Sequence, residues 1–150
     1  MRALTVRQPW GWAVAQGLKP IENRTWPPLE GVREFAVHAG LSIDHAGYQF
    51  PAMRNVLDLD EPYGAVHVTG AIIGYATILG AHPDGGCRFP GSPCAAWGMP
   101  SPRWSGDEGR DIWHWRVHGS PLAEPVPCRG ALGLWTVPPD VERLVAANLS

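Results

Sequence analysis

Three charged side chains stand close together in the stretch GLKPIENRTW, residues 17–26. Lys19, Glu22 and Arg24 alternate in sign, and Lys19 is the only lysine of the chain, whose other cationic residues are all arginines. Arginine keeps its charge and offers a fixed fork of donors, whereas lysine is a compact charge that loses its proton more readily when it is desolvated. We therefore expect position 19 to need the smaller, deprotonatable group.

A compact cation–anion–cation cluster of this kind is either a structural salt bridge or a site for a polar ligand. Trp10, Trp12 and Trp26 flank it in sequence, and a nucleobase pocket combines an aromatic stacking face with donors for base edges or phosphate. Trp10 shares one helical face with Ala13 and Val14, and we assign Trp10 to the core. Trp12 or Trp26 is then expected to stack on the ligand.

The net charge of −2 argues against a large phosphate-binding surface, but the charge is unevenly distributed. Towards the N-terminus, Arg2, Arg7, Lys19 and Arg24 stand against Glu22 alone, whereas acidic residues outnumber arginines in the rest of the chain. An anionic ligand should therefore meet the N-terminal segment. The small net charge favours a small ligand or a short contact over a long nucleic-acid track.

Cysteine and histidine residues are the candidate metal ligands. Cys87 and Cys94 lie close to His82 in sequence, and His114 and His118 come later. A zinc site is conceivable, but the chain has no C-x-x-C pair, and the usual zinc spacings are specific. We therefore assign no metal site and no cofactor, and whether His82, Cys87 and Cys94 bind a metal stays open.

The remaining composition bears on the cellular setting. No apolar stretch is long enough to span a bilayer, and the start MRALTVRQPW lacks the apolar region of a signal peptide. We expect a cytoplasmic protein with no membrane partner. Its three cysteines, an odd number, are then expected to be reduced.

The hydrophobic pattern predicts both strands and helices. Strands are expected at residues 3–6, 21–26, 33–40, 65–82, 111–117 and 131–137, and helices at 7–17, 42–59 and 139–149. Residues 65–82 are expected to form one or two strands, with bends at Gly70 and Gly74. Pro51 should kink or divide the second helix, and Gly17 suits the position just past the first. In the last helix Val141, Leu144 and Val145 should face inward.

This order of elements predicts one domain, residues 1–150, of the α+β class. We expect a small, mostly antiparallel β-barrel with flanking helices. Period two places Glu22 and Arg24 on the same face of their strand. Residues 83–111 are rich in Gly and Pro without periodicity, which indicates a loop or an insertion that is either functional or mobile.

The N-terminal segment resembles the opening of an ASCH domain. Members of this family typically show G-x-K-x-x-E-x-R after their first helix, and Gly17, Lys19, Glu22 and Arg24 match that motif in full. The preceding RQPW run resembles a bacterial subgroup of the family. FAVHAG resembles the next strand, and PVPCRGALGLWTVP, which contains Arg129, resembles the closing strand of bacterial members.

The resemblance implies a PUA-like β-barrel with a cleft between the first helix and the barrel. In the family this cleft binds RNA, nucleotides or modified nucleosides, and single-stranded DNA is a further candidate ligand here. From the motif and its surroundings, the expected ligand-binding residues are Arg7, Trp12, Gly17, Lys19, Glu22, Arg24, Trp26 and Arg129.

A hydrolase is the alternative function. Some proteins similar to this family hydrolyse the amide of acylated cytidine with the motif lysine, a threonine nucleophile and a glutamate, and others are described as metal-assisted ribonucleases. The threonine falls where this chain has Glu22, and Thr25 is expected on the opposite face of the strand. Lys19 and Glu22 would be the catalytic residues, with Glu22 as a general base on water. In a third interpretation, an interaction domain, the cluster is only a salt bridge.

Overall fold

The computed structural model describes residues 1–57, 65–102 and 111–149. The strands are β1 (Arg2–Gln8), β2 (Ile21–Arg24), β3 (Glu34–Ile43), β4 (Ala71–Pro83), β5 (Trp113–Pro127) and β6 (Leu134–Thr136). The helices are α1 (Trp10–Ala15), η1 (His45–Gln49), α2 (Pro51–Val56), η2 (Ala65–His67), α3 (Pro93–Trp97) and α4 (Pro139–Asn148), where η marks a 3₁₀ helix.

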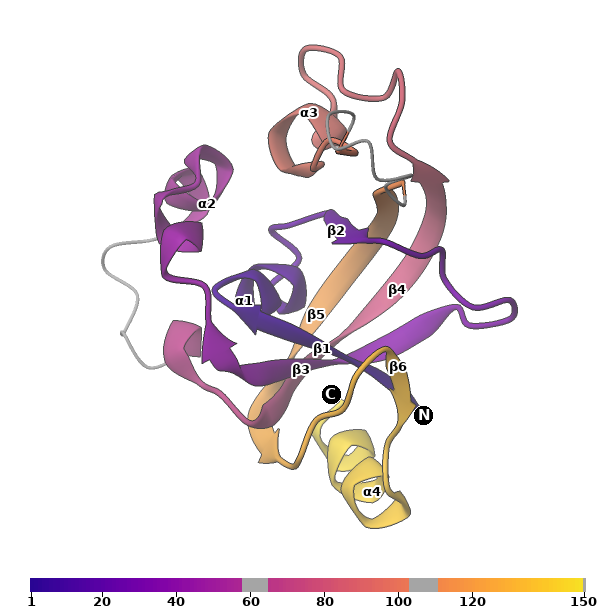
Figure 1. The fold of residues 1–150 in the computed structure, drawn as a ribbon. Helices are drawn as coiled ribbons and strands as arrows, with labels where there is room; N and C mark the ends of the chain where they lie inside the picture. The colour runs from indigo at the N-terminus through magenta and orange to yellow at the C-terminus, as the bar shows by residue number, and fades with distance from the viewer. Residues whose placement is uncertain (58–64, 103–110, 150) are drawn as a thin grey trace.

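The strands form one sheet in the order β2-β5-β4-β3-β1-β6 (Figure 1). The pairing of β1 with β3 is parallel and the other pairings are antiparallel. The expected α+β class and mostly antiparallel sheet are therefore confirmed. In the part of the chain that the structure describes, β2 and β6 are the edges and do not pair with each other, so hydrogen bonds do not close the sheet into the expected barrel. Both edge strands are short, and β2 ends just before the Pro27–Pro28 pair, which offers no N–H for a longer ladder.

Local signals in the sequence marked several boundaries correctly. Pro51 divides the expected helix at 42–59 into η1 and α2. Residues 42–43 of that range belong to β3 instead, and residues 58–59 lie outside the described part. Gly17 ends α1 with φ +71°, a conformation that glycine adopts without strain. Gly70, at φ +67°, separates η2 from β4, so only the second part of the strand expected at 65–82 is a strand.

Strand β5 is much longer than expected. It runs on from Trp113 through Pro121 and Pro125 to Pro127, whereas the strand expected here ended at residue 117. Strand β2 pairs only with residues 113–116 of β5. Beyond them one side of β5 is a sheet edge, and proline is tolerated there because its missing N–H removes no ladder bond.

Two further expectations need correction. Leu144 of α4 is 57% exposed, whereas Val145 is buried and Val141 packs beside it. Leu144 lies about 100° around the helix from Val145, outside the narrow stripe that meets the sheet. The segment at 83–111, expected to be irregular, contains α3, whose first turn is capped by the Ser92 hydroxyl. Residues 103–110 lie outside the described part.

Helix α1 packs on the sheet at unusually close range. A Cβ atom at Gly119 of β5 would lie 1.7 Å from the carbonyl oxygen of Val14, and one at Gly74 of β4 would lie 2.6 Å from the Cβ atom of Ala15. Only glycine fits at these two positions. They fix the depth of α1, and the turn at Gly17 then carries the chain to Lys19. None of the described helices is long and apolar enough to cross a membrane.

Replacing Gly119 by alanine should destabilise the protein by about 3 kcal/mol or more, because overpacking against backbone cannot be relieved by a side-chain rotation. Urea unfolding followed by circular dichroism measures the difference. Gly86→Ala is the matched control, since a Cβ atom there meets nothing within 4 Å. Equal stability of the two variants would contradict the close packing of α1.

Candidate functional site

The predicted charge cluster lies where the turn after α1 enters β2. Glu22 is at its centre: Oε2 accepts a hydrogen bond from Lys19 Nζ at 2.9 Å, and Oε1 accepts one from Arg24 Nε at 3.1 Å. The side chains of Lys19 and Glu22 are only 4% and 6% exposed, and that of Arg24 is 22% exposed. The predicted common face of Glu22 and Arg24 is confirmed.

The cluster is anchored to the backbone on both sides. Lys19 Nζ also donates to the carbonyl oxygen of Ile21, and Arg24 Nη2 donates to the carbonyl oxygen of Thr5 in β1 at 3.1 Å. Strands β2 and β1 are not neighbours in the sheet order. The sheet therefore curls until β2 approaches β1, and an arginine side chain bridges the two strands where no backbone ladder does.

Electrostatics keep Glu22 ionised. Burial alone would raise its pKa, but the charges of Lys19 and Arg24, together with their hydrogen bonds, outweigh burial and hold the pKa below the ordinary value. Both carboxylate oxygens are occupied by these partners. Glu22 therefore serves as the anion that holds two cations in place.

The cluster faces a cavity of about 340 Å³. Arg7 lines the same cavity, and three aromatic side chains from separate segments form a wall: Trp10 of α1, Phe50 at the start of α2 and Trp97 at the end of α3. The ring centroids of Trp10 and Phe50 are 5.3 Å apart, and those of Phe50 and Trp97 are 6.4 Å apart. Cations and aromatic faces thus meet around one hollow.

Trp10 is held in place by polar contacts. Its indole Nε1 donates to Asp44 Oδ2 at 2.9 Å, and Lys19 Nζ lies 5.7 Å from its ring centroid. The hydrogen bond from Trp10 lowers the pKa of Asp44, burial opposes this, and the charge of Arg7 lowers the pKa further. Asp44 is therefore an anion beside the cavity, and the indole ring is fixed before any ligand arrives.

Asn23 connects the cavity wall to β2, which we call the motif strand because it contains Glu22 and Arg24. Its Nδ2 donates to the carbonyl oxygen of Trp97 at 3.0 Å, and its Oδ1 accepts from the backbone N–H of Met99 at 2.8 Å. Both Trp97 and Met99 line the cavity. One amide side chain therefore positions the segment after α3 against β2.

The structure brings together four of the expected ligand-binding residues, Arg7, Lys19, Glu22 and Arg24, around this cavity. Gly17 acts through the backbone, by ending α1. The other expected residues lie elsewhere. Trp12 is 4% exposed in a core with Ile21 and Met53, Trp26 packs edge-on against Trp115, and Arg129 lines a second hollow beside Thr5 and His38.

The aromatic wall escaped the sequence analysis. Trp10 had been assigned to the core, yet it lines the cavity and Trp12 is buried. Residues 10 and 12 point to nearly opposite sides of a helix, and apolar residues cover both sides of α1, so hydrophobic pattern alone could not separate them. Phe50 and Trp97 reach the cavity through long-range packing that leaves no local signal.

The second hollow is built differently. Its volume is about 630 Å³, and Thr5, His38 and Cys128 line it together with Arg129. His38 Nε2 donates to the carbonyl oxygen of Cys128 at 3.0 Å, and the Thr5 hydroxyl lies 3.3 Å from its Nδ1. Burial lowers the pKa of His38. The buried polar atoms of Thr5, His38 and the Cys128 carbonyl satisfy one another, which leaves the exposed Arg129 to meet a polar ligand, so this hollow is a weaker candidate.

Possible metal ligands lie outside both hollows. The ligand atoms of His82, Cys87, Cys94 and His114 all lie within 4.8 Å of one another. His118, further along β5, does not belong to this group. Cys87, Cys94 and Cys128 are free cysteines in the described ranges. Burial, helped by the neighbouring Cys87, raises the pKa of Cys94 to about 11.

The chemistry of the site has to be assigned from its geometry, because comparison with known proteins found no match. No protein-family model matches the chain, and no curated protein matches it significantly. The cavity offers cations for an anionic or carbonyl group, an aromatic wall for a flat ring, and the side chains of Asn23 and Asp44 for hydrogen bonds.

Glu22→Gln should lower the free energy of unfolding by about 3 kcal/mol near neutral pH, because it leaves the buried Lys19 and the half-buried Arg24 without their counter-charge. Since the folded-state pKa of Glu22 is lowered, its contribution is present above the ordinary value of 4.5 and is lost as the pH falls through the folded-state pKa. The stability gap between wild type and variant should therefore narrow below pH 4.5.

Urea unfolding at a series of pH values measures this gap. Glu124→Gln, at an exposed position of β5, is the control and should change stability by no more than about 0.5 kcal/mol. A gap of constant size down to the lowest pH would show that the Glu22 charge does not hold the cluster together.

Proposed function

We propose that this chain is an ASCH-type domain that binds a nucleotide or modified nucleoside, free or as part of single-stranded RNA, in the cavity beside the motif. The observation that carries the proposal is the buried Lys19–Glu22–Arg24 cluster, which faces an aromatic wall across a hollow of about 340 Å³. Ligand cavities span about 300–1,000 Å³. The hollow is therefore suited to one nucleotide unit and not to a long tract.

The cations have donor capacity left for a ligand. An ammonium has three donors, and Lys19 uses two of them on Ile21 and Glu22, so one remains for a carbonyl or phosphate oxygen. Arg24 commits Nε and Nη2 to Glu22 and Thr5, which leaves donors on Nη1. Arg7 is exposed and lines the same cavity, where it would meet a phosphate.

The aromatic wall would hold the base. Stacking of a base on an aromatic side chain contributes about 1–3 kcal/mol and tolerates any base. Trp10 is the least buried tryptophan of the wall and is already oriented by Asp44. Asn23 and Asp44 line the cavity, and the second N–H of Asn23 Nδ2 and the remaining lone pairs of the Asp44 carboxylate can still meet base edges or ribose hydroxyls. The cavity therefore has a partner for each part of a nucleotide.

The curled sheet is consistent with a PUA-like barrel. Arg24 reaches across to Thr5 of β1 where the sheet lacks a closing ladder. Helix α1 lies on the sheet and leads directly into the motif. This placement supports the proposal, because the family resemblance implies a cleft next to the first helix.

A hydrolase is the second candidate, and the state of Glu22 argues for binding instead. A general base must accept a proton from water, whereas Glu22 has a lowered pKa and both of its oxygens are engaged by cations. Incubation of the protein with acylated cytidine or RNA should give no product. If the protein does turn over one of these substrates, and Lys19→Arg abolishes that turnover, the hydrolase becomes the better assignment of function.

Isothermal titration with nucleoside monophosphates, a modified nucleoside and short single-stranded RNAs tests binding directly. Arg7→Gln should weaken binding of phosphorylated ligands about tenfold, which is about 1.4 kcal/mol, and should weaken nucleosides without phosphate much less. Trp10→Leu should weaken both classes, because it removes the stacking face. Arg143→Gln, an exposed arginine of α4, is the control and should leave affinity unchanged. The proposal fails if none of these ligands binds saturably.

A further inference from the structure

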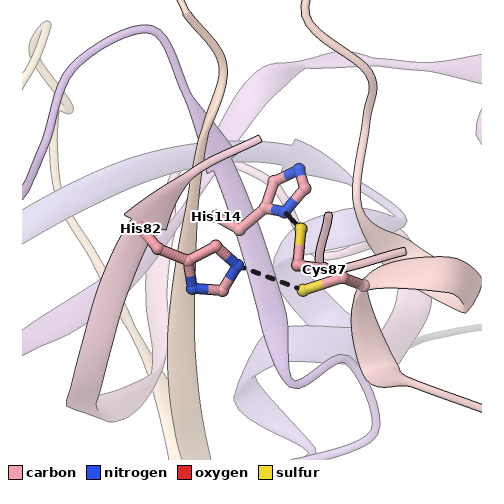
Figure 2. Close-up of side chains that lie close together, drawn as sticks. His82, Cys87 and His114 are labelled. Atoms are coloured by element: carbon pink, nitrogen blue, oxygen red, sulfur yellow. Dashed lines mark hydrogen bonds between the residues drawn. The ribbon is translucent and has the colours of Figure 1, made fainter. Parts of the chain in front are cut away.

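Four side chains with metal-binding atoms lie close together where β4 ends and β5 begins: His82, Cys87, Cys94 and His114. Figure 2 labels His82, Cys87 and His114. His82 and His114 are directly opposite each other in the antiparallel pairing of these strands. Cys87 follows β4 in the connecting segment, and Cys94 lies in the first turn of α3. Cys94 and His114 are buried, and His82 and Cys87 are half-buried. The group therefore combines two strands with the segment that contains α3.

The distances fit a tetrahedral ion. Cys87 Sγ lies 3.3 Å from His114 Nδ1, and Cys94 Sγ lies 3.5 Å from His82 Nε2. Zinc binds sulfur at about 2.3 Å and imidazole nitrogen at about 2.0–2.1 Å, so a tetrahedral site places sulfur and nitrogen about 3.5 Å apart. The four atoms lie within 4.8 Å of one another. A pair at that limit would need to close by about 1–1.5 Å, depending on whether it joins two sulfurs, a sulfur and a nitrogen, or two nitrogens.

The ring of His114 is set for coordination. Its Nε2 lies 2.8 Å from the carbonyl oxygen of Met99, which can only accept, so Nε2 is the protonated nitrogen. In the neutral ring this leaves the lone pair on Nδ1, the atom that faces Cys87. Asp84 Oδ1 lies 3.9 Å from the same Nε2. Metal-bound histidines commonly donate their other N–H to a carbonyl or carboxylate in this way.

The surrounding backbone also supports the group. The Ser92 hydroxyl donates to the carbonyl oxygen of Cys87 at 2.8 Å and accepts from the N–H of Ala95 at 3.0 Å. The Ser92 side chain thereby holds the loop around Cys87 against the start of α3. A Cβ atom at Gly98 would lie 2.8 Å from Cε1 of His114, so glycine allows the chain after α3 to pack against this ring.

We propose that His82, Cys87, Cys94 and His114 form a zinc site. Two thiolates and two imidazoles in a tetrahedral arrangement are a donor set typical of zinc. All four positions would be filled by the protein, which is the pattern of a structural site and not of a catalytic one. Two thiolates also balance the charge of Zn²⁺, and this removes the cost of burying a net charge.

The zinc site gives the 84–101 segment a role in the neighbouring cavity. Trp97 and Met99 of this segment line the cavity and bond to Asn23 of the motif strand. A zinc ion would hold the segment to β4 and β5 close to Asn23, which pairs with His114 across β2 and β5, and would therefore help to fix the same part of the cavity wall. The site does not depend on what the cavity binds.

Metal content of the full-length protein tests the site. Protein purified without chelators should contain about one zinc ion per chain by mass spectrometry of the elements. Replacement by Co²⁺ should give thiolate-to-cobalt charge-transfer absorption and the intense visible bands of tetrahedral cobalt. Removal of the metal should lower Tm by several degrees, because a structural metal adds its binding free energy to folding.

Variants assign the ligands. Cys94→Ser and His82→Ala should each lose most of the bound zinc, whereas Cys128→Ser, at the remote third cysteine, should keep it. Because the cobalt spectrum is measured on the wild type, the test holds even if a variant fails to fold. Zinc content is also independent of nucleotide binding, so the two proposals fail separately.

Three results would overturn the proposal. The first is a wild-type chain that holds no zinc after reconstitution with excess metal. The second is equal zinc content in the ligand variants and in Cys128→Ser. The third is a disulfide between Cys87 and Cys94 in freshly purified protein, found by peptide mass mapping, since it would make the pair a redox element instead of two ligands.

Discussion

A buried carboxylate must be matched by buried cations, and the Glu22 side chain imposes this constraint on the N-terminal half of the molecule. Removing one partner of such a cluster costs about 3–5 kcal/mol, so Lys19 and Arg24 are held where Glu22 needs them. Lys19 lies in the turn after α1. Close contacts with Gly74 and Gly119 set how near α1 lies to the sheet. Arg24 extends the cluster to β1. One anion thereby connects α1, β2 and β1.

The same constraint produces a binding surface. Cations that are held by an internal anion keep some hydrogen-bond donors for a ligand, and their positions are already fixed. Such preorganisation lowers the entropy cost of binding. The opposite wall comes from segments far apart in sequence, around residues 10, 50 and 97. Asn23 fixes the part of that wall around Trp97, and the proposed zinc site would hold the same segment to β4 and β5.

Sequence reasoning succeeded where the signal was local. The turn at Gly17, the break at Pro51 and the shared strand face of Glu22 and Arg24 each follow from the chemistry of one or two residues. It was misled where tertiary packing decides. Trp10 lines the cavity and Trp12 lies in the core, the reverse of the expectation, because apolar residues occupy both sides of the short helix α1. Strand β5 continues through its prolines because only its first residues pair with β2.

Four metal-binding atoms from three separate segments could not be joined by spacing rules, since the pairing of β4 with β5 brings His82 to His114. A crystal structure of the protein soaked with a nucleoside monophosphate would show directly whether the cavity beside Lys19, Glu22 and Arg24 holds a nucleotide. We expect the base against Trp10 and the phosphate near Arg7, with Lys19 and Arg24 donating to the ligand. A nucleotide bound in the hollow beside Thr5 and His38, or no bound nucleotide at saturating concentration, would contradict the account.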